Sequence, residues 1–268
     1  MKIPSLRIYT IAYLVFLYTP IVILPLFAFN NATVIAFPLR GFTTEWFVAV
    51  WNDMELRGAL INSLIVAAST SVLATTFGVF AARASTRYAF PGKAPVMGLI
   101  MLPMVLPEMI LAMSLLVVLL ALGVKLSLFT VILGHVLVCT PFSVAILTSA
   151  FQSLDKSLEE VAYDLGEGPV STFRLVILPL VLPGIISSML ITFTISLDEF
   201  IVSNFLKSGE ELLSTYIYSK LRFPKYVPNI MALGTILVVI SITLLTLAEY
   251  FRRRGLAKTG AKDSGGFV

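Results

Sequence analysis

The sequence has 268 residues, of which 58% are hydrophobic and only 13% are charged. An average soluble domain has about 25% charged residues, so this charge is too sparse to cover a water-soluble globule of this length. A disordered chain is excluded as well, because such chains are poor in apolar residues. The single cysteine, Cys139, excludes an intramolecular disulfide, and the single histidine, His135, excludes a site built from several histidines. An integral membrane protein is the class that remains.

Six apolar runs are long enough to cross a bilayer, since a transmembrane helix needs about 20 mostly apolar residues. In chain order the runs cover residues 8–29, 59–82, 94–120, 128–150, 177–206 and 229–251. The first run is longer than the apolar part of a secretory signal peptide, which favours a retained span over a cleaved signal. The sequence therefore predicts an all-α membrane protein with six transmembrane helices in a single domain of residues 1–268.

Lysine and arginine are spread unequally between the two sets of loops. If both termini are cytoplasmic, most of the 19 basic residues fall on that side, including the cluster Arg252–Arg254 beside the last span. Cytoplasmic loops carry an excess of Lys and Arg, so this distribution predicts two cytoplasmic termini. The net charge of +4 follows from this topology, and we expect no nucleic-acid partner.

The loop between the first two spans, residues 30–58, carries an apolar stripe with helical spacing. Its members are Phe42, Trp46, Phe47, Val50 and Trp51. A stripe of this kind that contains tryptophan predicts an amphipathic helix at the outer membrane interface. Two roles stay open for it: a membrane-surface anchor, or part of a docking surface for an outer partner that the loop 207–228 could join.

The cytoplasmic loop, residues 151–176, has the pattern of two short helices. Ser157 and Glu160 have the spacing of a capping box. The apolar residues of the first helix share one face, and they are Leu158, Val161, Ala162 and Leu165. Gly166 suits a left-handed helix end, and Pro169 suits the first turn of a second helix that leads into the fifth span. Periodicity alone does not decide whether this pair packs on itself or inserts into a cytoplasmic partner.

Three acidic residues lie well inside the predicted spans: Glu108 in the third, and Asp198 and Glu199 in the fifth. Ionisable groups are costly in a bilayer, so such residues are usually functional or paired. Pro103 and Pro107 precede Glu108 and can open its helix toward a cavity, because proline removes backbone hydrogen bonds. The acids could line a path for a cationic solute, or they could cap broken helices or bond a partner subunit.

No set of residues predicts catalysis or metal binding. His135 and Cys139 lie one turn apart on the fourth span, but no third ligand is apparent, so we expect a packing role. The phosphate-binding pattern Gly-x-x-x-x-Gly-Lys-Ser/Thr is absent, so the chain is not predicted to hydrolyse ATP by that route. Small polar residues are frequent in the second span, where they could serve helix packing or line a pore.

The cytoplasmic loop resembles the EAA loop of ATP-binding-cassette importer permeases. That motif is Glu-Ala-Ala, a glycine four residues on, and an apolar-Leu-Pro sequence about a dozen residues later. The matching residues are Glu160, Ala162, Gly166, Leu178 and Pro179. Val161 replaces the first alanine of the motif, and Glu167 stands where the family usually has alanine.

Two further stretches are similar to the subgroup of these permeases that transports spermidine and putrescine. They are residues 107–112 in the third span and 196–200 in the fifth. Both keep the acidic character of the subgroup, whereas Ala112 replaces its common glycine. The resemblance implies a type I importer permease (MetI-like) fold in the inner membrane of a bacterium, and a transport subunit rather than an enzyme.

The resemblance also implies partners. They are a second homologous permease subunit, which would form a heterodimer, two ATP-binding subunits at the cytoplasmic loop, an extracytoplasmic solute-binding protein and the lipid bilayer. ATP and Mg²⁺ would bind the ATPase subunits, and this chain would bind no cofactor. The loop would couple to the ATPase through Glu159, Glu160, Ala162, Tyr163, Asp164 and Gly166.

In this interpretation the three acids of the spans belong to the substrate pathway of a small cationic solute such as a polyamine. Another solute of the same family stays open: an opine, an amino-acid derivative, a quaternary amine, thiamine or an iron chelate. A carrier driven by an ion gradient is the alternative from a different class. Six spans without a detectable internal repeat, together with the elaborate cytoplasmic loop, weigh against that carrier.

Overall fold

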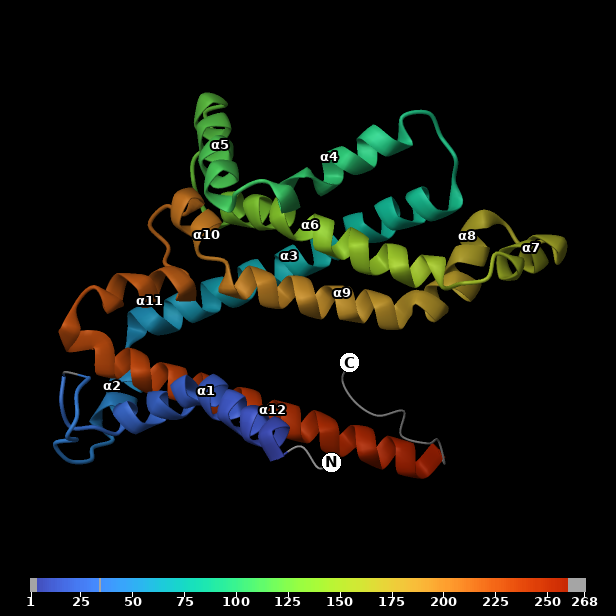
Figure 1. Ribbon diagram of the computed structural model, residues 1–268. Coiled ribbons are helices and arrows are strands. Elements are labelled where there is room, and N and C mark those ends of the chain that lie inside the picture. Colours follow the sequence, from blue (N-terminus) through green and yellow to red (C-terminus); the bar gives the residue numbers. More distant parts are fainter. Residues whose placement is uncertain (1–3, 34, 260–268) are drawn as a thin grey trace. The chain divides into compact units, whose positions relative to one another are not determined.

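The computed structural model describes residues 4–33 and 35–259 (Figure 1). The long helices and short connecting helices are α1 (Pro4–Ala28), α2 (Glu45–Asn52), α3 (Met54–Arg87), α4 (Lys93–Val105), α5 (Glu108–Ala121), α6 (Leu128–Gln152), α7 (Ser157–Asp164), α8 (Pro169–Thr172), the π-helix η1 (Phe173–Ile177), α9 (Leu178–Asp198), α10 (Ile201–Leu206), α11 (Leu213–Leu221), the 3₁₀-helix η2 (Pro224–Tyr226) and α12 (Val227–Thr259). Within the described residues, the β-structure is an isolated antiparallel bridge between Asn30 and Phe42. The predicted all-α class is confirmed.

Five helical segments are long and apolar enough to cross a membrane. They are Leu6–Ala28, Met54–Arg87, Leu128–Gln152, Pro169–Asp198 and Pro224–Thr243. Helices α4 and α5 pass the same test together, but they form a broken pair bent by 110°. Counting this pair as one span gives six spans in the described part of the chain.

The bend between α4 and α5 corrects the expectation of a continuous helix over residues 94–120. Leu106 is extended, with ψ at 142°, and Pro107 follows it. A residue before proline is pushed out of the helical region, and proline donates no backbone hydrogen bond. Pro107 therefore breaks the third span, whereas Pro103 lies within α4, and Glu108 becomes the first residue of α5.

The fifth span differs from the predicted run 177–206 at both ends. It begins at Pro169, passes through the π-helical turn η1, and ends at Asp198. The chain is then extended at Glu199 before α10 begins at Ile201.

The last helix, α12, continues to Thr259, beyond the end of the predicted span at residue 251. The side chains of the predicted Arg252–Arg254 cluster lie outside the described part.

The chain divides into two compact units. One contains residues up to Asp53 and from Ile217 onward, and in it α1 and α2 pack against α12. The other is Met54–Tyr216, in which α3, α6 and α9 lie side by side as a three-helix core (Figure 1). Helix α5 packs against α10, which also contacts α6, and α7 lies against α8 and η1 at the start of the fifth span.

Small and hydroxylated residues bring the three core helices together. Gly78 of α3 lies against Ser143 and Leu147 of α6, where a larger residue would clash. The Ser188 hydroxyl of α9 hydrogen-bonds with the hydroxyls of Ser143 (2.7 Å) and Thr75 (3.2 Å). Such contacts are typical of helices that associate in a bilayer, where apolar burial gives no driving force. These buried hydroxyls favour the packing role for the polar residues of α3.

Gly134 allows close helix packing where α6 meets α10, and this contact gives a first prediction. A Cβ atom there would lie 2.5 Å from the side chains of Val202 and Leu206. We expect Gly134→Ala to destabilise the subunit by about 1–3 kcal/mol through overpacking. Gly98→Ala on α4, where nothing lies within 4 Å, should be neutral or stabilising. Thermal unfolding of the purified subunit in detergent measures both, and equal effects would contradict the close packing at Gly134.

Candidate functional site

Helix α7, in the loop of residues 151–176, begins with a cap from Asp155. The Asp155 carboxylate accepts a hydrogen bond from the backbone N–H of Ser157 at 3.0 Å. Together with the Ser157 hydroxyl, this bond holds the pKa of the Asp155 carboxyl below its usual range. The predicted capping box between Ser157 and Glu160 is wrong, because Ser157 is already the first helical residue. The residue in the N-cap position is Lys156, and its side chain makes no capping hydrogen bond.

Helix α7 ends at Gly166 in a left-handed turn, as predicted. Gly166 has a φ of +86°, and its N–H donates to the carbonyl of Tyr163 at 2.9 Å. The next N–H, of Glu167, donates to the carbonyl of Ala162 at 3.0 Å. These two bonds form the Schellman helix end, which satisfies the last carbonyls and turns the chain sharply. Pro169 then begins α8, also as predicted.

An ion cluster ties α7 to the end of α3. The Glu159 carboxylate accepts hydrogen bonds from Arg83 (3.2 Å) and Arg87 (2.7 Å), and each of these side chains is at most 12% exposed. Arg87 also donates to the carbonyl of Leu154, and the Arg83 guanidinium lies over the ring of Phe173 at 5.0 Å. Glu159, predicted as a coupling residue, therefore holds the loop in place from inside.

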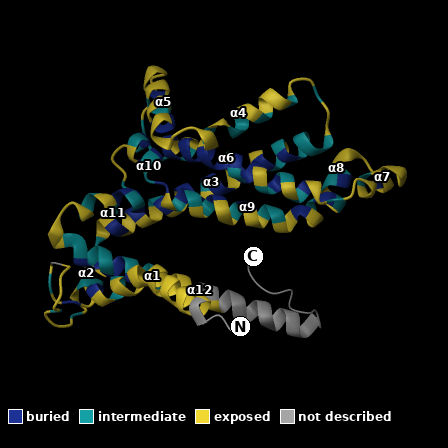
Figure 2. Ribbon diagram, viewed as in Figure 1, coloured by how far each residue is buried: buried dark blue, intermediate teal, exposed yellow. Residues whose placement is uncertain are grey.

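Most of the remaining surface of α7 is exposed (Figure 2). Of the predicted apolar face only Ala162 is buried. Leu158, Val161 and Leu165 are 41%, 56% and 80% exposed, respectively. The polar coupling candidates around them are also exposed, and they are Glu160, Tyr163 and Asp164. An exposed apolar patch with acidic neighbours is typical of a protein interaction site, so the helix pair does not bury this face on its own chain.

The acidic residues of the spans meet where the fifth span breaks. Glu199 is 8% exposed, and its carboxylate accepts the backbone N–H of Val202 at 3.0 Å, which caps α10. Asp198, the last residue of α9, is exposed. Glu108 is exposed at the first residue of α5, and α5 packs against α10. Glu199 thus has the helix-capping role, while Asp198 and Glu108 present carboxylates at the surface of the unit.

His135 of α6 contacts both sides of this break. Its Nδ1 hydrogen-bonds with the hydroxyl of Ser196 at 2.7 Å, and its Nε2 with the hydroxyl of Ser203 at 2.9 Å. The side chain is completely buried. Cys139 has only a weak contact to the carbonyl of Thr192 at 3.7 Å. Among the described residues, no three His, Cys, Asp or Glu side chains are placed to hold a metal ion.

These features agree with what comparison to known proteins finds. Residues 74–255 match the family described as binding-protein-dependent transport system inner membrane component. The chain belongs to this family. The expected importer permease family is thereby confirmed, and the chain is a multi-pass permease of the bacterial inner membrane.

The permease is also similar to named relatives. It is 35% identical over 240 residues to the spermidine/putrescine transport system permease protein PotC of Haemophilus influenzae, covering 89% of this chain and 93% of that protein. It is 34% identical over 239 residues to PotC of Escherichia coli K12, covering 89% and 90%. It is 32% identical over 231 residues to the putrescine transport system permease protein PotI of the same strain, covering 83% and 82%. These relatives are transport permeases rather than enzymes.

Solved structures show the same fold. One chain of a bacterial ABC transporter involved in the import of the acidic polysaccharide alginate aligns with a TM-score of 0.72 at 17% identity, covering 92% of this permease and 98% of that chain. An alginate ABC transporter in complex with a periplasmic protein bound to an alginate pentasaccharide gives a TM-score of 0.70 at 20% identity, covering 94% and 93%. The predicted importer permease fold is confirmed.

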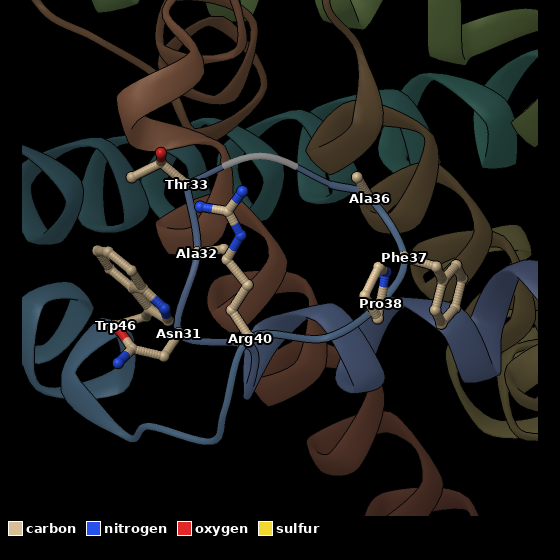
Figure 3. A pocket seen from close by; sticks show the side chains of 8 residues that line it. All are labelled: Asn31, Ala32, Thr33, Ala36, Phe37, Pro38, Arg40 and Trp46. Carbon is tan, nitrogen blue, oxygen red and sulfur yellow. The ribbon is translucent and has the colours of Figure 1, made fainter.

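The other unit of the permease carries the predicted amphipathic helix as α2, preceded by a loop with a cavity of about 470 Å³ (Figure 3). The Trp46 indole donates to the Asn30 carbonyl at 2.9 Å, and the Asn30 side chain accepts the N–H of Arg40 at 3.0 Å. These bonds close the base of the loop. The cavity is lined by Asn31, Ala32, Thr33, Ala36, Phe37, Pro38, Arg40 and Trp46. Phe42 lies before α2, in the bridge with Asn30, rather than on the helix.

Proposed function

We propose that this permease forms part of an ATP-driven importer that moves spermidine, putrescine or a related polyamine into the cell. The observation that carries the proposal is the 32–35% identity to polyamine permeases over 83–89% of the chain. A polyamine carries several positive charges. The exposed carboxylates of Asp198 and Glu108, in spans that are otherwise apolar, suit such a solute because they would lower the barrier to its passage.

The energy would come from two ATP-binding subunits, which would hold ATP and Mg²⁺. The exposed face of α7 supports this, since a short helix fixed to α3 from behind can transmit motion of a partner into the core. The face combines apolar residues with Glu160, Tyr163 and Asp164, and Gly166 sets its orientation. In this proposal α7 lies on the cytoplasmic side of the membrane, and the distribution of Lys and Arg predicts the same side for both termini.

Two further partners complete the proposed importer. A second homologous permease would pair with this one as a heterodimer and enclose the pathway. A solute-binding protein would deliver the polyamine on the outer side, where the loop around Arg40 and Trp46 offers an exposed surface. The structural relative that is an alginate ABC transporter is in complex with a periplasmic protein bound to an alginate pentasaccharide.

Uptake of labelled polyamine into proteoliposomes that contain the complete importer tests this function. We expect ATP-dependent uptake of spermidine or putrescine by the wild-type complex. Uptake that needs a proton gradient and no ATP would instead indicate an ion-coupled carrier. Failure to transport either polyamine with ATP, while another cationic solute is taken up, would overturn the assignment of the substrate.

A second prediction concerns the carboxylates of the proposed substrate pathway. We expect Asp198→Asn to lower the maximal rate of polyamine uptake about tenfold, because a loss of about 1.4 kcal/mol of stabilisation of a cationic solute in the pathway slows its passage by that factor. Glu210→Gln is the matched control, since it removes an exposed carboxylate outside the break. Equal rates for wild type and Asp198→Asn would remove Asp198 from the pathway.

A further inference from the structure

We propose that His135 is a positioning residue that fixes the break in the fifth span and thereby the carboxylates of Asp198 and Glu199. The inference rests on the proposed function, in which the exposed carboxylate of Asp198 faces the solute. The break itself, and the side chains that hold it, are properties of the fold. The role of His135 can therefore be tested without any solute.

The hydrogen bonds around the break run in one direction. The Ser203 hydroxyl donates to the backbone carbonyl of Glu199 at 2.8 Å, so its oxygen is left to accept from Nε2 of His135 at 2.9 Å. A neutral imidazole has one N–H, so Nδ1 accepts from the Ser196 hydroxyl at 2.7 Å. The chain of donors thus runs from Ser196 through His135 and Ser203 to Glu199. This assigns the Nε2–H tautomer to His135.

A break in a spanning helix needs such partners. Between Asp198 and Ile201 the backbone leaves the helix, and polar groups there cannot be satisfied by lipid. The carbonyl of Glu199 accepts from Ser203 and also from the Ser214 hydroxyl at 3.1 Å, while the Glu199 carboxylate takes the N–H of Val202. The Glu199 carbonyl and the Val202 N–H are therefore satisfied by side chains, and His135 links one of these side chains, Ser203, to α6.

The histidine is suited to this place because its two ring nitrogens point in opposite directions. One reaches Ser196, the last turn of α9, and the other reaches Ser203 in α10. Asp198 and Glu199 lie between these two anchors, so the anchors determine where both carboxylates point. Cys139 lies one turn along the same helix and is also buried, but the hydrogen bond of its thiol goes to Thr192 of α9, on one side of the break.

The test uses the chemical reactivity of position 198 in the assembled importer. Cys139→Ser removes the only cysteine, and Asp198→Cys then places a single thiol at the break. A membrane-impermeant charged thiol reagent measures how accessible that thiol is. We expect His135→Leu to change its reaction rate about threefold or more, since the loss of even one buried hydrogen bond shifts a conformational equilibrium by that much. His135→Gln, which can bond one of the two serines, should give an intermediate rate.

Lys125→Cys in the turn before α6 is the control reporter, because it is exposed and lies on the chain segment that leads into the same helix. Its rate should not depend on residue 135. An unchanged rate at position 198 in both His135 variants would overturn the proposal. Equal changes at positions 198 and 125 would overturn it as well, since they would mean that α6 as a whole had shifted.

Transport supplies a second readout that a general packing role would not give. In the proteoliposome assay, Ser196→Ala and His135→Leu should be strongly non-additive, because both remove the same link. Cys139→Ala should leave uptake near wild type. If the wild-type complex transports no polyamine, the proposed function fails, while the thiol reaction still decides the role of His135.

Discussion

Replacing Gly166 with proline is expected to abolish ATP-driven uptake while the permease still inserts in the membrane. Proline fixes φ near −65°, but Gly166 has a φ of +86°. The substitution also removes the N–H that donates to Tyr163. The combined cost of about 3 kcal/mol or more would lower the population of the native turn, relative to other loop conformations, by more than about 100-fold. The exposed face of α7 would then point elsewhere, and the ATPase subunits would lose their docking site.

Gly168→Ala is the matched control for this variant. Gly168 lies two residues further on and has an extended backbone with φ at −79°, and a Cβ atom added there would meet nothing within 4 Å. We expect its uptake to stay near wild type. Membrane fractionation, co-purification of the ATPase subunits and uptake are measured for both variants. Normal ATPase binding and uptake in Gly166→Pro would exclude α7 as the coupling helix.

The spans and the ends of α7 could be predicted from the sequence because their causes are local. A run of about 20 apolar residues forms a helix in a bilayer whatever surrounds it. Gly166 permits a left-handed turn and Pro169 fixes the backbone at its own position, so single residues determine the break between the two loop helices. Pro107 acts in the same way between α4 and α5, although the angle of 110° depends on what the two helices pack against.

The second break could not be predicted in this way. Glu199 and Phe200 are neither glycine nor proline, and the apolar run continues to Leu206. The chain leaves the helix there because side chains replace the lost backbone bonds. His135, which holds one of these side chains, Ser203, is 61 and 68 positions away from its serine partners. A contact over that distance leaves no pattern in one sequence, so the sequence alone predicts only a packing role for His135.

The role of Glu159 shows the same limit. It belongs to the acidic group of α7 in the sequence, and helical spacing does not distinguish it from its neighbour Glu160. The difference comes from α3, where Arg83 and Arg87 lie one turn apart and 76 and 72 positions before Glu159. In the sequence both arginines count only toward membrane orientation, because a charge excess in a loop says nothing about its partners.

This ion cluster leads to the last prediction. We expect Glu159→Ala to reduce uptake per assembled importer more than tenfold, whereas Glu160→Ala has a smaller effect. Removing the carboxylate leaves two guanidinium groups, at most 12% exposed, without their partner. Breaking a buried ion pair from one side costs about 3–5 kcal/mol, while loss of an exposed acid costs little within the subunit itself. The loop would detach from α3 and transmit less of the ATPase motion.

A double-mutant cycle distinguishes this clamp from an independent contact of Glu159 with the ATPase. Arg87→Ala should reduce uptake by itself, since Arg87 holds both Glu159 and the carbonyl of Leu154. If the two residues act through each other, Glu159→Ala combined with Arg87→Ala should be little worse than the more damaging single variant. Additive losses would mean that Glu159 works on the partner and Arg87 on the loop. In that case α7 would need another attachment to pass motion into α3, and the cluster would be a consequence of the fold rather than part of the coupling.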